Sequence, residues 1–91
     1  MVDKGEIEEA IRRILLERLR IPQSVVNDLS PTTPLLGRGL GLDSIEATTL
    51  IASLEQVFSV EFSDEELEPG LFASLQSLIE AVAEKPAGKS Q

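Results

Sequence analysis

One serine stands where covalent chemistry could take place, in the stretch GLGLDSI at residues 39–45. Ser44 comes directly after Asp43 and follows three alternating glycines, which give the backbone freedom as it approaches the serine. The helical spacing of apolar residues begins at the same point. Two interpretations are open. Asp43 and Ser44 begin an ordinary helix, or Ser44 is an exposed handle to which a separate enzyme attaches a group.

The residue types that most enzymes rely on are missing from this sequence. It has no Cys, which removes disulfides, a thiolate nucleophile and cysteine zinc sites, and it has no His to shuttle protons near neutral pH. Carboxylates remain, but no two of them are set apart by a cleft pattern. The run Asp64, Glu65, Glu66 and Glu68 lacks the spacing of an EF-hand loop and is typical of a solvated face. We therefore expect no enzyme, no catalytic residue and no metal site.

The charge is unevenly distributed along the chain. The formal net charge is −8, and all of it lies in residues 43–91, because residues 1–42 sum to zero. An acidic half repels nucleic acid and anionic lipid and attracts basic protein surfaces. Solubility alone would explain some excess acid, but not why the excess begins at Asp43. We expect partners with basic docking patches and no nucleic acid.

The length of 91 residues allows one small domain with a core of a few helices. We place this domain at residues 1–84 and a flexible, polar tail at residues 85–91. The sequence has no window of about 18 uninterrupted apolar residues, so we expect no membrane insertion. The opening MVDKGEIEEA lacks the apolar core of a secretory signal. We expect a cytoplasmic monomer that is free-standing.

The pattern of apolar residues predicts three main helices and one short helix. Apolar residues recur at spacings of three and four over residues 4–20, about 44–59 and about 74–83. Ser63 and Glu66 form a capping box that would start a short helix in SDEELEP, which Pro69 and Gly70 would end. No alternating strand pattern of useful length is present. The predicted fold class is all-α, a four-helix bundle.

The helix that begins at Ser44 has its own start signal, since Asp43 and Glu46 have the spacing of a capping box. We expect its apolar face to consist of Ile45, Thr49, Leu50, Ala52, Leu54, Val57 and Phe58. The connection before it, residues 21–42, contains three prolines and three glycines but is too apolar for a solvated linker. A connection of about 20 residues inside a compact domain is often functional. We predict an ordered loop laid across the helices, with one short turn near residues 24–29.

Taken in order, these features resemble the acyl carrier protein family. The resemblance is carried by GLGLDSIEATTLIASLEQVFSVEFSDEEL at residues 39–67 and LFASLQSLIEAV at residues 71–82. Asp43-Ser44-Ile45 matches the Asp-Ser-Leu/Ile attachment motif of that family. The resemblance covers nearly the whole chain and is strongest from Leu35 onward. It implies the four-helix bundle of acyl carriers and a specialised, discrete carrier.

The resemblance also implies a cofactor. Ser44 would bear a covalent 4′-phosphopantetheine arm, taken from coenzyme A by a phosphopantetheinyl transferase, and Asp43 would flank the motif and cap the helix. A helix N-terminus suits the phosphodiester of such an arm. Acyl intermediates would be held as thioesters for fatty-acid, polyketide or specialised lipid biosynthesis. The lack of Cys then fits, because the thiol arrives with the cofactor.

The partners implied are the transferase and acyltransferase, ketosynthase or acyl-activating enzymes with basic patches. The acids expected to dock them are Glu46, Glu55, Asp64, Glu65 and Glu66. The chain departs from the family where Thr49 and Gln56 replace acids that are common after the serine, which indicates a specialised carrier. We expect Leu50, Leu54, Phe58, Phe62, Leu75 and Ile79 to form the core and to line any cavity for an acyl chain.

Two alternatives stay open at this point. A peptidyl or D-alanyl carrier would share the fold and the arm but load an amino acid. Leu42 and Asp43 ahead of Ser44, in place of the Gly-Gly-rich approach of peptidyl carriers, argue against it. An acidic helical interaction module that is never modified would leave Ser44 unreactive toward any transferase.

Overall fold

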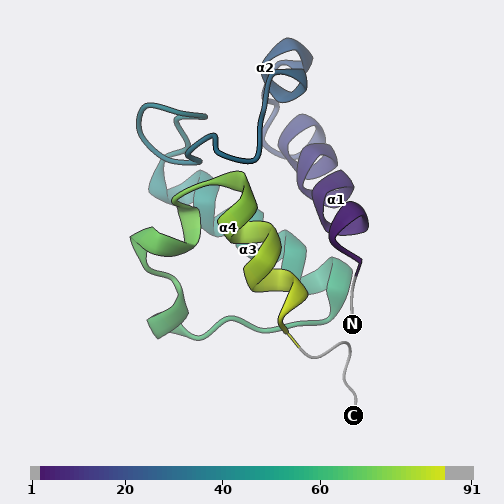
Figure 1. Cartoon of the computed structure of the whole chain (residues 1–91), viewed down its shortest axis with the longest axis vertical. Coiled ribbons are helices and arrows are strands. Elements are labelled where there is room, and N and C mark those ends of the chain that lie inside the picture. The colour runs from purple at the N-terminus through teal and green to yellow at the C-terminus, as the bar shows by residue number, and fades with distance from the viewer. Residues whose placement is uncertain (1–2, 86–91) are drawn as a thin grey trace.

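The structure is a computed structural model that describes residues 3–85. This range contains four α-helices and two 3₁₀ turns, joined by loops (Figure 1). Their bounds are α1 Lys4–Glu17, α2 Gln23–Asn27, α3 Ser44–Phe58, η1 Asp64–Glu66, η2 Pro69–Phe72 and α4 Leu75–Ala83. Within this range the only β-type pairing is an isolated bridge between Leu36 and Leu42. The predicted all-α fold class is confirmed. Of the predicted tail, residues 86–91 lie outside the described residues.

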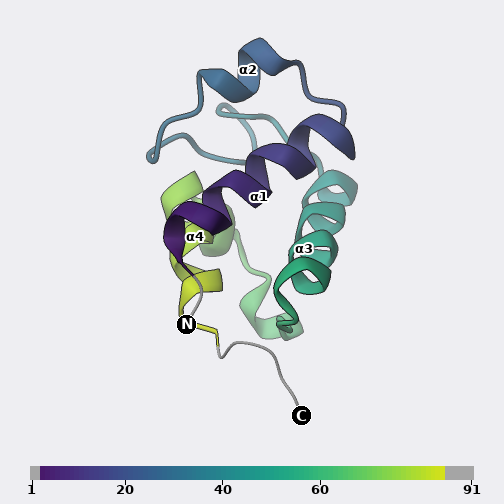
Figure 2. The ribbon, with the colours of Figure 1, turned by 90° about the vertical axis from the view of Figure 1, so that its right-hand side faces the viewer.

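The core forms where α1 lies across α3 and α4, as Figure 2 shows. The first helix contributes a stripe of Ile and Leu at helical spacing, and the long loop contributes four buried residues, Val26, Leu29, Leu35 and Leu42. The largest fully buried side chains are Ile7, Ile11, Leu15, Val26, Leu35, Leu50, Leu54, Leu75, Leu78 and Val82. Because Val26 and Leu35 belong to residues 21–42, the prediction that this connection is ordered and packed on the helices is confirmed.

Helix α1 is shorter than the predicted range 4–20. The side chain of Asp3 accepts a hydrogen bond from the backbone N–H of Glu6 at its start. The helix ends at Glu17, and Arg20 adopts a left-handed backbone with φ of 58°. This reversal directs the chain toward Pro22, which cannot continue a helix because it lacks an N–H.

The turn predicted near residues 24–29 is the short helix α2. Five residues do not form a stable helix on their own, so α2 depends on its neighbours. The guanidinium of Arg12 on α1 donates hydrogen bonds to the carbonyls of Val26 and Leu29 and is paired with Glu8. These bonds hold the first part of the long loop against α1.

The short helix predicted in SDEELEP is instead the 3₁₀ turn η1, and a second 3₁₀ turn, η2, begins at Pro69, where the sequence predicted a break. The predicted capping box is present, since the backbone N–H of Ser63 donates to Glu66 Oε1 at 2.8 Å. Only three residues follow it before the chain departs at Leu67, too few for a full α-helical turn. Pro69 then begins η2. Proline is favourable in the first turn of a helix, because its fixed φ suits that position and its missing N–H is not needed there.

The predicted apolar face of α3 is partly wrong. Ile45 is 76% exposed and Val57 is 57% exposed, and Ala52 is also exposed. The helix faces the core with Ala47, Leu50, Ile51, Ser53 and Leu54 instead. At 100° per residue, Ile45 and Ala52 lie on the opposite side of the helix from Leu50.

Residues 34–42 form a closed loop that leads into Ser44. The backbone N–H of Leu40 donates to the carbonyl of Pro34 at 2.8 Å, and the N–H of Leu42 donates to the carbonyl of Leu35 at 3.0 Å. Gly39 lies inside this loop, where a Cβ would overlap the carbonyl of Pro34. The loop therefore requires glycine at this position.

We predict that Gly39→Ala lowers the free energy of unfolding by roughly 2 kcal/mol, because the added methyl forces the loop backbone to move. Urea denaturation followed by circular dichroism measures the change. Gly70→Ala is the matched control, since a Cβ there would meet only a carboxylate oxygen of Glu68 at 4.0 Å. Equal stability of the two variants would contradict the prediction.

Candidate functional site

Ser44 is the first residue of α3, and Asp43 is its N-cap. Asp43 Oδ1 accepts a hydrogen bond from the backbone N–H of Glu46 at 2.7 Å, and Glu46 Oε1 accepts one from the N–H of Asp43 at 3.0 Å. This reciprocal pair confirms the predicted capping box. It fixes the backbone on both sides of Ser44.

The serine itself is left open. Ser44 is exposed, and its hydroxyl forms no hydrogen bond with any residue in the range 3–85. Within the same range, the backbone N–H groups of Ser44 and Ile45 have no hydrogen-bond partner either. Two free N–H groups at the positive end of a helix dipole favour an anion such as a phosphodiester. The site fits the attachment of a phosphate-linked group to the hydroxyl.

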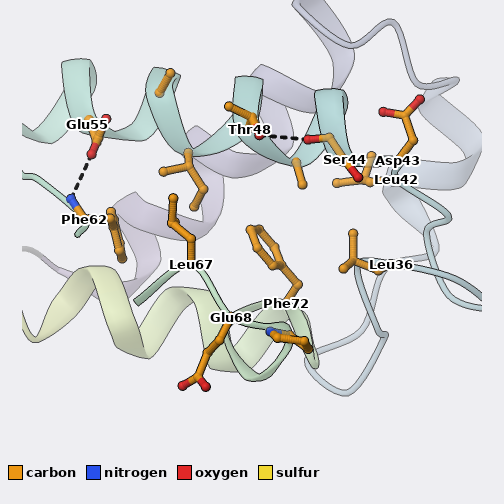
Figure 3. Close-up of a pocket in the computed structure, with 14 residues that line it drawn as sticks. Leu36, Leu42, Asp43, Ser44, Thr48, Glu55, Phe62, Leu67, Glu68 and Phe72 are labelled. Carbon is orange, nitrogen blue, oxygen red and sulfur yellow. Dashed lines mark hydrogen bonds between the residues drawn. The ribbon is translucent and has the colours of Figure 1, made fainter. Parts of the chain in front are cut away.

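A cavity of about 570 Å³ begins beside Ser44 and runs between α3 and the segment that carries η1 and η2 (Figure 3). Phe72 and Leu67 project into the space below α3, whereas the carboxylate of Glu68 points away from it. Most of the lining is apolar. The lining residues are Leu36, Leu42, Asp43, Ser44, Ala47, Thr48, Ile51, Ala52, Glu55, Phe62, Leu67, Glu68, Pro69 and Phe72.

The expected cavity lining is largely corrected by the structure. Of the six residues predicted to line an acyl cavity, only Phe62 does so. Leu50, Leu54, Leu75 and Ile79 are buried elsewhere in the core, and Phe58 is half-buried outside the lining. The sequence does contain a signal for one wall of the cavity. Ser44, Thr48, Ile51 and Glu55 are three or four residues apart, which places them on one face of α3. The residues from η2 carried no such signal.

The far end of the cavity is held by polar contacts. Glu55 Oε2 accepts a hydrogen bond from the backbone N–H of Phe62 at 2.8 Å. The ammonium of Lys85 lies 4.6 Å from the centre of the Phe62 ring and forms an ion pair with Glu66. The hydrogen bond from Lys85, and then that from the Ser63 N–H, lowers the pKa of Glu66 below its ordinary value. Lys85 thus links the end of α4 to η1.

The five predicted docking acids fall into two groups. Glu46, Glu55 and Glu66 each accept a hydrogen bond from a backbone N–H, so their carboxylates serve the fold. Asp64 and Glu65 are exposed on η1, and their side chains form no hydrogen bond or ion pair with the residues described. Sequence spacing alone does not separate the two groups.

Residues 3–85 lack two features that would bear on the site. They contain no cluster of three or more acids that could hold a metal ion. None of the helices in this range combines the length and the apolar character that crossing a membrane requires.

The chain matches a family model and several known proteins over most of its length. Residues 9–82 match the family model described as the phosphopantetheine attachment site. Three proteins named acyl carrier protein, from strains Tuc7, 5A and APS of Buchnera aphidicola subsp. Acyrthosiphon pisum, are each 43% identical over 63 residues. Each alignment covers 68% of this chain and 72% of the relative. Ser44 lies inside the region matched by the family model.

We predict that Asp43→Ala lowers the free energy of unfolding by about 1 kcal/mol, because α3 loses its side-chain cap. Asp43→Asn keeps an acceptor oxygen and should lose less than half of that. Urea denaturation of both variants and the wild type measures the difference. If Asp43→Ala unfolds at the wild-type midpoint, the cap does not stabilise the site.

Proposed function

Because the chain belongs to the phosphopantetheine-attachment family of acyl carrier proteins, we propose that Ser44 is the residue that bears its arm. As a member of that family the chain is a carrier rather than a catalyst, and covalently attached 4′-phosphopantetheine is its cofactor. The observation that supports Ser44 is its open hydroxyl at the start of α3, beside two unpartnered N–H groups and the mouth of the cavity.

The arm supplies the thiol that holds acyl groups, and the residues of this chain position and shelter what is attached. The capping box keeps the start of α3 rigid, so that the arm leaves the protein at a defined place. A phosphopantetheinyl transferase and acyl-handling enzymes act on carriers of this family. We assign the chain to acyl biosynthesis of the fatty-acid, polyketide or specialised lipid type, and its identity to acyl carrier proteins supports this.

The cavity supports an acyl rather than an aminoacyl cargo. Its walls include Leu36, Ile51 and Phe72. The carboxylates of Asp43 and Glu68 point away from it in Figure 3, and that of Glu55 is bonded to the backbone N–H of Phe62 at its far end. An apolar chain that enters such a cavity leaves water, which favours the loaded form. We propose that the first carbons of the acyl chain lie between α3 and η2.

The attachment is tested by intact mass after incubation with coenzyme A and a broad-specificity phosphopantetheinyl transferase. The wild type should gain the mass of one arm, and Ser44→Ala should gain none. Ser24→Ala removes another exposed serine, from α2, and should be modified like the wild type. Circular dichroism shows whether the variants are folded. A gain in Ser44→Ala, or none in the wild type, would contradict the proposal.

The cargo is tested by thermal unfolding of chains loaded from octanoyl- or acetyl-coenzyme A with the same transferase. Burial of several methylene groups should raise the midpoint of the octanoyl form by about 5 °C or more above that of the unacylated form. The acetyl form, which has almost no apolar chain to bury, should melt with the unacylated form. Identical midpoints for the octanoyl and acetyl forms would show that the chain stays in solvent.

A further inference from the structure

The cavity beside Ser44 ends at Phe62. The backbone N–H of Phe62 is bonded to Glu55, which follows Ser44 by eleven residues on α3, about 16 Å along the helix axis. Figure 3 shows this bond at one end of the cavity and Ser44 near the other. An acyl chain that enters beside the serine and follows α3 therefore reaches Phe62 last.

A second space lies on the other side of Phe62. It has a volume of about 340 Å³ and lies between the 3₁₀ turns and α4. Phe62 and Glu68 are the two described residues that line both spaces, and the carboxylate of Glu68 points away from the cavity in Figure 3. Phe62 is therefore the apolar side chain that separates the cavity from the space beyond it.

The space beyond Phe62 is apolar only in part. Leu71 on η2 and Ala81 on α4 line it, together with several acids that include Glu80 and Glu84. An acyl chain that passes Phe62 can bury further carbon atoms against Leu71 and Ala81. The ring of Phe62 thus stands between a shorter apolar path and a longer one.

The ring of Phe62 is held from outside the cavity by Lys85. The ammonium nitrogen of Lys85 lies 4.6 Å from the ring centre, as in a cation–π contact, and the same nitrogen is paired with Glu66 on η1. The backbone N–H of Lys85 donates to the carbonyl of Val82 at 3.1 Å, which fixes the lysine to the end of α4. The Lys85 side chain is only 17% exposed, so salt screens its ion pair weakly.

These contacts restrain both the backbone and the ring of Phe62. Glu55 holds the backbone N–H from α3, and Lys85 holds the ring from α4. An acyl chain that moves the ring aside has to break the contact with the ammonium group. That cost opposes the gain from burying its last carbon atoms.

We propose that Phe62 sets the longest acyl chain that this carrier shelters, and that Lys85 holds the ring in the position that sets it. This inference rests on the proposed function, because it concerns the acyl group that an arm on Ser44 carries. The cargo that fits is a medium-length saturated chain that fills the cavity as far as Phe62. The last carbon atoms of a longer chain stay in water.

The experiment measures thermal unfolding of chains loaded from octanoyl-, dodecanoyl- or hexadecanoyl-coenzyme A by a broad-specificity phosphopantetheinyl transferase. Each midpoint is compared with that of the unacylated form of the same variant. In the wild type, the hexadecanoyl form should melt within about 1 °C of the dodecanoyl form, because the added methylene groups are not buried.

Phe62→Ala removes the ring and joins the two spaces. Its hexadecanoyl form should melt about 4 °C or more above its dodecanoyl form. Phe58→Ala is the matched control, because Phe58 is half-buried and lines neither space, and it should keep the wild-type pattern. Adding Ala81→Leu to Phe62→Ala fills the second space from α4 and should restore the wild-type pattern.

Lys85→Met tests the contact that holds the ring, since methionine keeps an unbranched apolar side chain and removes the ammonium group. Its hexadecanoyl form should melt about 2 °C or more above its dodecanoyl form, because the ring is then easier to displace. Lys4→Met removes an exposed ammonium group from α1 and should keep the wild-type pattern.

Three results would overturn the inference while leaving the proposed function intact. They are a wild-type midpoint that rises from dodecanoyl to hexadecanoyl by as much as that of Phe62→Ala, the same pattern in Phe62→Ala and Phe58→Ala, and the same pattern in Lys85→Met and Lys4→Met. A wild-type chain that accepts no arm would overturn the proposed function. Circular dichroism before each scan identifies any variant that is not folded. If Phe62→Ala is unfolded, Phe62→Leu replaces it in the comparison.

Discussion

The position of Ser44 depends on how the loop of residues 34–42 is closed and held. Leu35 is fully buried, and its backbone N–H donates to the carbonyl of Phe72 at 3.1 Å. The same loop is closed on itself by the bond from Leu42 to the carbonyl of Leu35. One residue is therefore anchored in the core, tied to η2 and tied to the approach to the serine. The position of Ser44 therefore depends on the contacts of Leu35.

The same junction ties together the two sides of the cavity. One side is the face of α3 that starts at Ser44, and the other is η2, which the loop holds through Phe72. The backbone N–H of Leu75 also donates to the carbonyl of Thr33, which links the loop to the start of α4. A carrier needs an arm that leaves at a defined point and a space that opens beside it. Here both are set by backbone hydrogen bonds of one irregular segment.

The sequence was sufficient for the features that depend on local pattern. The fold class, the capping boxes at Asp43 and Ser63, and the packing of the long loop all follow from spacing and residue type. The cavity lining did not, because it depends on which side of α3 faces η2, a long-range contact that local periodicity does not encode. The two 3₁₀ turns were also missed, since a start signal followed by three residues reads the same for an α-helix and a 3₁₀ turn.

The acids that follow the serine differ in what their carboxylates contact in the folded chain. Residues 43–91 carry the whole net charge, and a helix that follows the serine with Glu46 and Glu55 looks like an acidic docking face. In the folded chain these two carboxylates accept backbone hydrogen bonds that shape the site and its cavity. Each of these bonds fixes the orientation of its carboxylate relative to the backbone. Asp64 and Glu65, by contrast, are exposed on η1 and form no hydrogen bond or ion pair with the described residues, a difference that depends on long-range contacts and not on spacing along the chain.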